Sequence, residues 1–246
     1  MSRFALVPLD ERPVNTRYPR MIAAIAGGDV LLPPEDIRGS GRIGADTEAV
    51  ARWLRDTGPQ CDGAVVCAEF LCWGNLIQSR ISDADAVAGM GRLGALDGLS
   101  TPGRPVYLFG LVTRIPNAND CVEEPLYWET FGTRFHRISQ LLHREQLGVL
   151  ESGEREELAR IGGEIPAAHR DDWLVRRLRN HVLNLSLLER LARGGVDLLL
   201  LTSDDTSTFG LGTSEKAWLE GWAGLLGPAV GERLLIHPGA DEVGSA

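Results

Sequence analysis

Carboxylates and arginines recur where apolar runs of the chain end, and this pattern is the first indication of a functional site. The run at residues 198–201 leads through Thr-Ser to the adjacent pair Asp204 and Asp205. The charged and amide side chains that follow other apolar runs are Asp10, Glu11, Arg12, Asn15, Glu69, Arg114, Asp241 and Glu242. A continuous apolar run is typical of a strand buried on both faces of a parallel sheet. Ligands bind at the carboxyl ends of such strands, so we expect these groups to share one cleft.

Several carboxylates in one cleft favour acid/base chemistry. Their mutual repulsion and unequal burial would hold one protonated while another stays ionised, as glycoside hydrolysis requires. The pair Asp204-Asp205 is similar to the paired aspartates of barrel hexosaminidases, in which one carboxylate orients the acetamido group and the other is the general acid. By that analogy Asp205 is the general acid and Asp204 orients or stabilises the substrate, with Glu11 and Glu69 as supporting carboxylates. Each carboxylate also has a structural interpretation, because Asp and Glu form turns, cap helices and pair with arginine.

Substrate contacts are expected from arginines, amides and one aromatic side chain. Guanidinium groups bind carboxylates and hydroxyls with defined geometry. Residues 71–80 are predicted to form a loop or turn whose polar and aromatic groups suit a ring-shaped ligand, although Trp73 could equally pack and Arg80 could be a surface charge. The predicted substrate-binding residues are Asp10, Arg12, Asn15, Trp73, Asn75, Arg80, Arg114, Asn180, Asp241 and Glu242.

A predicted helix after Pro166 carries two stripes. Arg176, Asn180 and Asn184 are spaced i, i+4, i+8 and therefore share one helix face, which either lines the site or faces water. Leucines at 174, 178 and 185 form a neighbouring apolar stripe.

Two other kinds of function remain open. Oxygen ligands from the same carboxylates, with His237, could hold Mg²⁺ or Mn²⁺ and make a metal-dependent hydrolase. No HxH or HExxH motif supports that site, so no metal or other cofactor is expected. A non-catalytic sugar-binding or sensing domain would use the same cleft without turnover. The sequence contains no GxSxG motif for a serine nucleophile.

The composition of the chain argues against several classes of partner. The chain has 246 residues, a net charge of −9 and no basic run, so we expect no nucleic-acid partner. Its apolar runs are too short to span a bilayer, and the N-terminus lacks the pattern of a signal peptide, so a cytoplasmic location without a membrane partner is expected. The expected partner is a small-molecule substrate, a sugar, and the oligomeric state stays open. Four cysteines without a CxxC pair argue against structural zinc.

The predicted elements alternate between strands and helices. Strands are expected near residues 4–9, 30–32, 63–70, 105–112, 196–201 and 233–236. This alternation predicts an α/β fold with a mostly parallel sheet and flanking helices, as a partial or complete TIM-like barrel or as an open doubly wound sheet. We expect one α/β domain over residues 1–246, with a mostly helical insertion at 123–193 and a truncated C-terminus, because the chain ends just after the sixth strand. Trp218 and Trp222, four residues apart on a helix near 214–226, are expected in the core.

Several of these segments together resemble a known family. They are Pro8-Leu-Asp-Glu-Arg-Pro-Val-Asn15, Leu31-Leu-Pro-Pro34, residues 69–80, Arg179-Asn180-His181 with Asn184, Ser203-Asp-Asp205 and Gly239-Ala-Asp-Glu-Val-Gly244. The chain resembles, over essentially its whole length, an uncharacterised bacterial family defined by a domain of unknown function. Members of that family are usually longer than this chain. The resemblance implies that the segments belong to one site, and it implies no activity.

Overall fold

The sheet is open and entirely parallel in the part of the chain that is described. The computed structural model describes residues 2–204 and 207–239. The strand order is β2-β1-β3-β4-β5-β6. The strands are β1 (Arg3–Val7), β2 (Asp29–Leu31), β3 (Gly63–Cys67), β4 (Val106–Val112), β5 (Leu198–Ser203) and β6 (Leu234–Pro238). The predicted α/β class with a parallel sheet is confirmed, and these six strands do not close on themselves.

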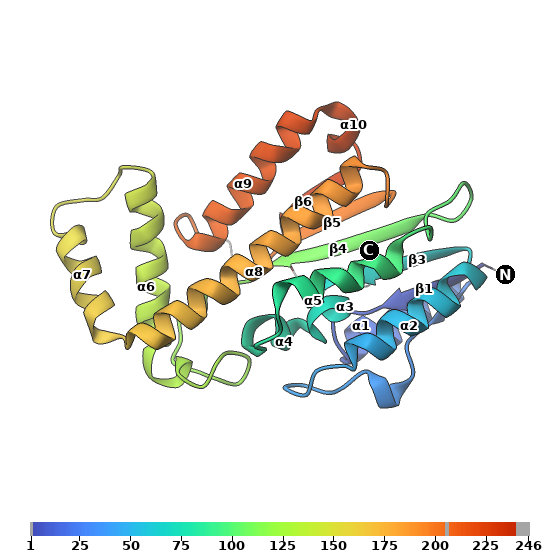
Figure 1. Ribbon diagram of the computed structural model, residues 1–246, viewed down its shortest axis with the longest axis horizontal. Helices are drawn as coiled ribbons and strands as arrows, with labels where there is room; N and C mark the ends of the chain where they lie inside the picture. The colour runs from blue at the N-terminus through green and yellow to red at the C-terminus, as the bar shows by residue number, and fades with distance from the viewer. Residues whose placement is uncertain (1, 205–206, 240–246) are drawn as a thin grey trace.

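The direction of the chain reverses once in the sheet. From β1 the chain passes through α1 (Pro13–Ile25) to β2 on one side, and then through α2 (Thr47–Thr57) back past β1 to β3. Because parallel crossovers are right-handed, this reversal places α1 and α2 on opposite faces of the sheet (Figure 1). Open α/β sheets bind ligands at such a reversal, here between the carboxyl ends of β1 and β3.

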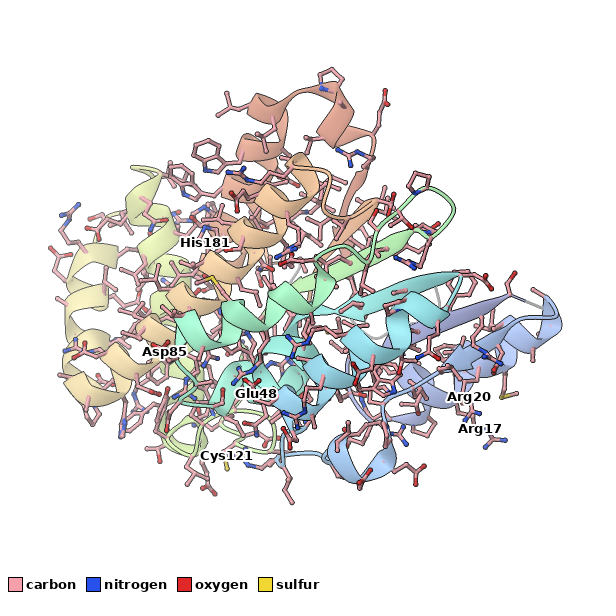
Figure 2. All side chains as sticks on the ribbon, turned by 45° about the vertical axis from the view of Figure 1, so that its right-hand side comes forward. Arg17, Arg20, Glu48, Asp85, Cys121 and His181 are labelled. Atoms are coloured by element: carbon pink, nitrogen blue, oxygen red, sulfur yellow. The ribbon has the colours of Figure 1, made fainter. Side chains whose placement is uncertain are left out.

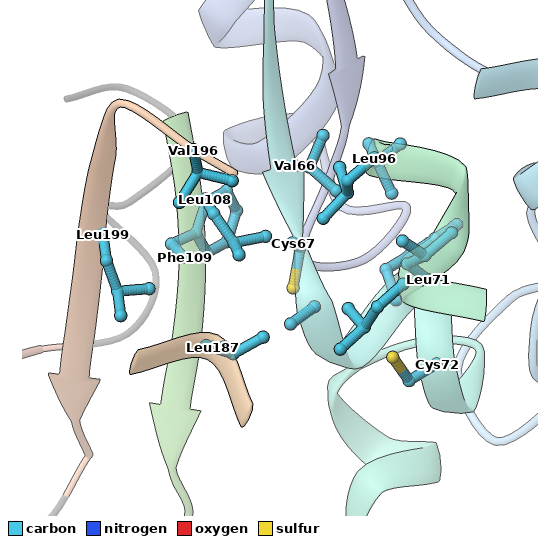
Figure 3. Close-up of a cluster of buried hydrophobic side chains, with 14 of the residues drawn as sticks. Val66, Cys67, Leu71, Cys72, Leu96, Leu108, Phe109, Leu187, Val196 and Leu199 are labelled. Carbon is cyan, nitrogen blue, oxygen red and sulfur yellow. The ribbon is translucent and has the colours of Figure 1, made fainter. Parts of the chain in front are cut away.

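Aliphatic side chains in register hold the central strands together. Val66, Leu108 and Leu199 lie side by side on β3, β4 and β5, and each is essentially buried. Figure 3 shows Leu187, from the long helix α8 (Ala167–Ala192), next to these strands. A Cβ atom on Gly110 would lie 2.6 Å from Leu187 Cδ1, so glycine allows α8 to pack this closely against β4.

A second, smaller core lies among the helices between β4 and β5. Helices α6 (Trp128–Gln146) and α7 (Glu154–Glu164) extend away from the sheet beside the first turns of α8 (Figure 1). Trp128 and Phe135 stack with ring centroids 4.7 Å apart, and Trp173 of α8 packs against Phe135 at 4.9 Å. This cluster is separate from the core of the sheet.

The remaining elements are short, apart from α9. They are α3 (Ala68–Trp73), α4 (Leu76–Ile81), α5 (Ala86–Gly91), α9 (Leu211–Leu226), α10 (Pro228–Gly231) and the 3₁₀ helices at Glu35–Ile37, Gly58–Gln60 and Arg92–Leu96. None of the helices in the described ranges combines the length and the hydropathy that a membrane-spanning helix needs.

Two local predictions were wrong, those for residues 71–80 and for Trp218 and Trp222, and the structure decides which way the stripes of α8 face. Residues 71–80 form parts of two helices rather than a loop, since Gly74 ends α3 with φ of 109° and Asn75 caps α4. The apolar stripe on α8 lies largely at the surface, and Leu178 is 62% exposed. The polar face of α8 lies instead against α4 and β4, where its side chains donate hydrogen bonds to backbone carbonyls. Trp218 and Trp222 are 63% and 48% exposed, so they are not core residues. They line a groove between α9 and α6.

Candidate functional site

A buried arginine binds three carboxylates at the carboxyl ends of β4 and β5. Arg80 on α4 is only 4% exposed. Its Nη1 lies 2.8 Å from Glu123 Oε2 and 3.4 Å from Glu124 Oε1, while its Nη2 donates to Asp204 Oδ2 at 3.0 Å. The expectation that Arg80 binds in the site is compatible with this position, and the alternative of a surface charge is wrong.

A second arginine, Arg114, lies on the solvent side of the same carboxylates. Its Nη2 donates to Glu123 Oε2 at 3.0 Å, and its Nε lies 3.7 Å from Asp204 Oδ2. The Arg114 side chain is 41% exposed, so solvent reaches this edge of the group. We call Arg80, Arg114, Glu123, Glu124 and Asp204 the arginine–carboxylate cluster.

Glu124 differs from the other carboxylates of the cluster. Burial raises the pKa of Glu124 to about 7, although Arg80 and Arg114 pull it down. Its Oε1 lies near Arg80 but makes no hydrogen bond with any described residue. A cavity of about 20 Å³, which is room for one water, lies beside it and is also lined by Tyr127.

Sequence reasoning missed Glu124. The available signal was two acidic residues before Pro125, in the connection that follows β4.

The carboxyl end of β1 carries a second polar group. Asp10 accepts hydrogen bonds from Arg12 Nε at 2.8 Å and from Asn15 Nδ2 at 2.8 Å. Asn15 is fully buried in the first turn of α1, and its Oδ1 has no hydrogen-bond partner among the described residues. Asp10, Arg12 and Asn15 are therefore brought together beside the reversal of strand order.

A glycine-containing loop at residues 39–44 connects the two groups. Glu11 Oε1 accepts from Gly41 N at 2.6 Å, and Asn75 Nδ2 donates to Gly41 O at 2.9 Å. Arg42 Nη1 donates to the carbonyls of Cys121 and Glu124 at 2.6 and 2.9 Å. Figure 2 labels Cys121 on the outer edge of the segment that this arginine holds. The loop thus fixes the segment that carries Glu124 relative to β1.

Glu69 lies beneath the site rather than in it. Its Oε1 accepts from Leu111 N at 2.8 Å, and Cys67 Sγ donates to its Oε2 at 3.4 Å. Burial raises the pKa of Glu69 to about 7. These contacts join β3 to β4, and the catalytic role predicted for Glu69 stays a prediction.

Trp73 and Asn180 also contact protein groups. The guanidinium of Arg179 lies 4.2 Å from the centroid of the Trp73 ring. Asn180 Nδ2 donates to Ser79 O at 2.8 Å. Both side chains support α4, which carries Arg80, from inside the fold.

One comparison with known proteins identifies the family. The family model described as "Protein of unknown function (DUF4127)" matches residues 4–246. The chain belongs to this family. No curated protein and no solved structure matches the DUF4127 chain. The expectation of an uncharacterised domain family is therefore confirmed, and its description names no activity.

Part of the predicted site of the DUF4127 chain lies outside the described residues. Asp205, Asp241 and Glu242 are in that part. Within residues 2–204 and 207–239, no three His, Cys, Asp or Glu side chains form a group that could hold a metal ion. His237, at the end of β6, has its Nδ1 2.6 Å from Pro238 O.

Proposed function

We propose that the DUF4127 chain is a carbohydrate-active hydrolase whose acid/base chemistry uses Glu124 and Asp204. The observation that carries the proposal is that both carboxylates contact one buried guanidinium in unlike surroundings. Glu124 is buried with a pKa of about 7 and an oxygen free of hydrogen bonds to described residues, whereas two arginines lie against Asp204. Carboxyl groups whose environments differ in this way divide into acid and base.

The chemistry follows from that division. Glu124 would donate its proton, through the one water that the cavity beside it has room for, to the leaving glycosidic oxygen as the bond to the anomeric carbon breaks. Asp204 would stabilise the positive charge that develops on the sugar ring and orient the attacking water, whose proton returns to Glu124. Asp205 was predicted as the general acid from sequence, so Glu124 and Asp205 are competing assignments for that role.

Substrate hydroxyls would bind at the β1 group. The partly exposed Arg12 offers a donor and Asp10 an acceptor, while the fully buried Asn15 holds Asp10 in place by donating from its Nδ2. The exposed edge of Arg114 suits a hydroxyl or carboxylate of the sugar. The net charge of −9 argues against a nucleic-acid partner, and we place the enzyme in the cytoplasm with a small-molecule substrate and no membrane partner.

Hydrolysis of aryl glycosides, including N-acetylhexosaminides, tests this proposal. Wild type would be compared with Asp204→Asn, Glu124→Gln, Asp205→Asn and the control Glu156→Gln, which alters an exposed carboxylate on α7. We expect turnover that resists chelator, survives in the control, and falls at least about 100-fold when a group essential to acid/base catalysis is removed.

Other outcomes would identify the alternatives. Activity that disappears with chelator and returns with Mn²⁺ indicates a metal-dependent hydrolase. Saturable sugar binding without turnover indicates a binding or sensing domain. Full activity in both Asp204→Asn and Glu124→Gln would contradict the assigned residues.

A further inference from the structure

A groove of about 750 Å³ lies between α6 and α9, on the outer side of the helical segment. Trp218, Trp222 and Leu225 of α9 form one wall, and His143 and Gln146 belong to α6. This volume lies within the usual range for small-molecule sites. The groove is separate from the arginine–carboxylate cluster, with which it shares no lining residue.

The tryptophans present two aromatic surfaces to this groove. They are one helical turn apart, and more than two fifths of each side chain is exposed. Gly221 lies between Trp218 and Trp222 along α9, and a Cβ atom there would meet no other atom within 4 Å. The absence of a side chain leaves a depression in this wall of the groove. Aromatic rings stack on indole in offset or edge arrangements, which add to the stabilisation that burial gives.

A buried histidine adds a single directed donor. His143 is 6% exposed, and its Nδ1 accepts a hydrogen bond from Gly210 N at 3.1 Å. An accepting Nδ1 leaves the proton of the neutral ring on Nε2. No described residue accepts a hydrogen bond from this Nε2. Burial also lowers the pKa of His143, which favours the neutral donor over the cation.

Polarity changes along the groove. Near the start of α9, Gln146 Oε1 accepts from Ser214 Oγ at 3.0 Å, which leaves the amide hydrogens of Gln146 available as donors. At the other end, Leu225 and Trp222 are apolar. The described lining contains no Asp, Glu, Lys or Arg, so it favours an uncharged ligand.

We propose that this groove binds a neutral aromatic compound that carries a carbonyl group. The ring would stack on Trp218 and Trp222, and the carbonyl oxygen would accept from His143 Nε2. A sugar fits less well, because its many hydroxyls would need more polar partners than this wall offers. The site is independent of the proposed hydrolase activity.

Binding of 2-naphthamide, followed by isothermal titration calorimetry, tests the proposal. We expect saturable binding to wild type that weakens about tenfold in His143→Phe, which loses one hydrogen bond, and at least as much in Trp222→Leu. Leu178→Ala is the control, since Leu178 is an exposed apolar side chain on α8 outside the groove, and it should bind as wild type does.

The design separates binding from folding and from self-association. Circular dichroism reports whether each variant is folded, and His143→Asn, whose Oδ1 can still accept from Gly210 N, replaces His143→Phe as the donor test if the latter unfolds. No saturable binding to wild type, or equal binding by Trp222→Leu, overturns the proposal. So does a wild-type dimer in sedimentation velocity that Trp222→Leu converts to a monomer, since the groove would then be an interface between copies.

Discussion

Two buried glutamates, Glu69 and Glu124, make the stability of the fold depend on pH. Burial is the main cause that raises the pKa of Glu69 and of Glu124 to about 7. Between pH about 4.5 and 7 the folded chain therefore holds more protons at these groups than the unfolded chain does. Their protonated forms stabilise the fold fully below that interval, and the contribution is lost as pH rises through the folded pKa.

Glu69→Gln should remove one of these pH dependences. The amide oxygen can still accept from Leu111 N, but the side chain no longer ionises. Wild type should lose stability as pH rises, because Glu69 ionises while buried, and the variant should not. The difference in unfolding free energy, variant minus wild type, should therefore increase by about 3 kcal/mol from pH 4.5 to pH 8. Urea unfolding at several pH values measures this, and parallel curves for the two proteins would contradict it.

The second residue-scale prediction concerns Arg80. Arg80→Met leaves Glu123, Glu124 and Asp204 without their shared guanidinium. Breaking a buried ion pair from one side typically costs about 3–5 kcal/mol, and we expect a loss of that order in chemical denaturation at pH 8. Arg17→Met is the control, because Arg17 projects from α1 into solvent (Figure 2) and should change stability by less than about 0.5 kcal/mol. Equal losses in both variants would show that burial of Arg80 has no special role.

Sequence identified the charged strand ends but not which of them would be buried. Asp10, Arg12 and Asn15 are close in the chain, so their contacts follow from one turn. The buried position of Glu124 depends on distant contacts, such as the hydrogen bond that Arg42, 82 residues away, donates to its backbone carbonyl. Such long-range contacts leave no local pattern to find.

At the scale of elements, α8 shows why amphipathic patterns can mislead. Beside leucines such as Leu187, its buried face carries polar side chains that satisfy backbone carbonyls of its neighbours, as Asn180 does for Ser79 and Asn184 does for Leu111. Arg179 does the same for Ser82 at 2.8 Å. A helix that packs on the ends of other helices and strands buries donors as well as leucines.

Substitutions on the two faces of α8 should therefore have effects opposite to those a simple pattern suggests. Leu178→Ser changes an exposed leucine, and we expect less than about 0.5 kcal/mol of change in unfolding free energy. Asn184→Leu removes the donor to Leu111 O in a site with 2% exposure, and should cost about 1–3 kcal/mol. Thermal and urea unfolding measure both, and the reverse ranking would contradict the assigned faces.

At the scale of the whole molecule, the strands were predictable and their order was not. Each strand is an apolar run that can be recognised locally, so the parallel α/β class followed from the sequence. The reversal after β2 and the open edges depend on which strands pair across long distances. The helical residues 123–193 were predicted as an insertion, and their separate core provides a way to test whether they behave as a unit.

Phe135→Ala should loosen the helical unit before the sheet. Phe135 is fully buried and stacks on Trp128, so its truncation should cost about 3–5 kcal/mol within this smaller core. Hydrogen exchange followed by mass spectrometry should show faster exchange in α6 and α7, while β3, β4 and β5 keep their protection. Leu108→Ala, in the core of the sheet, is the matched control and should speed exchange throughout. If Phe135→Ala exposed all strands equally, the two cores would unfold as one cooperative unit, and residues 123–193 would not be a separable insertion.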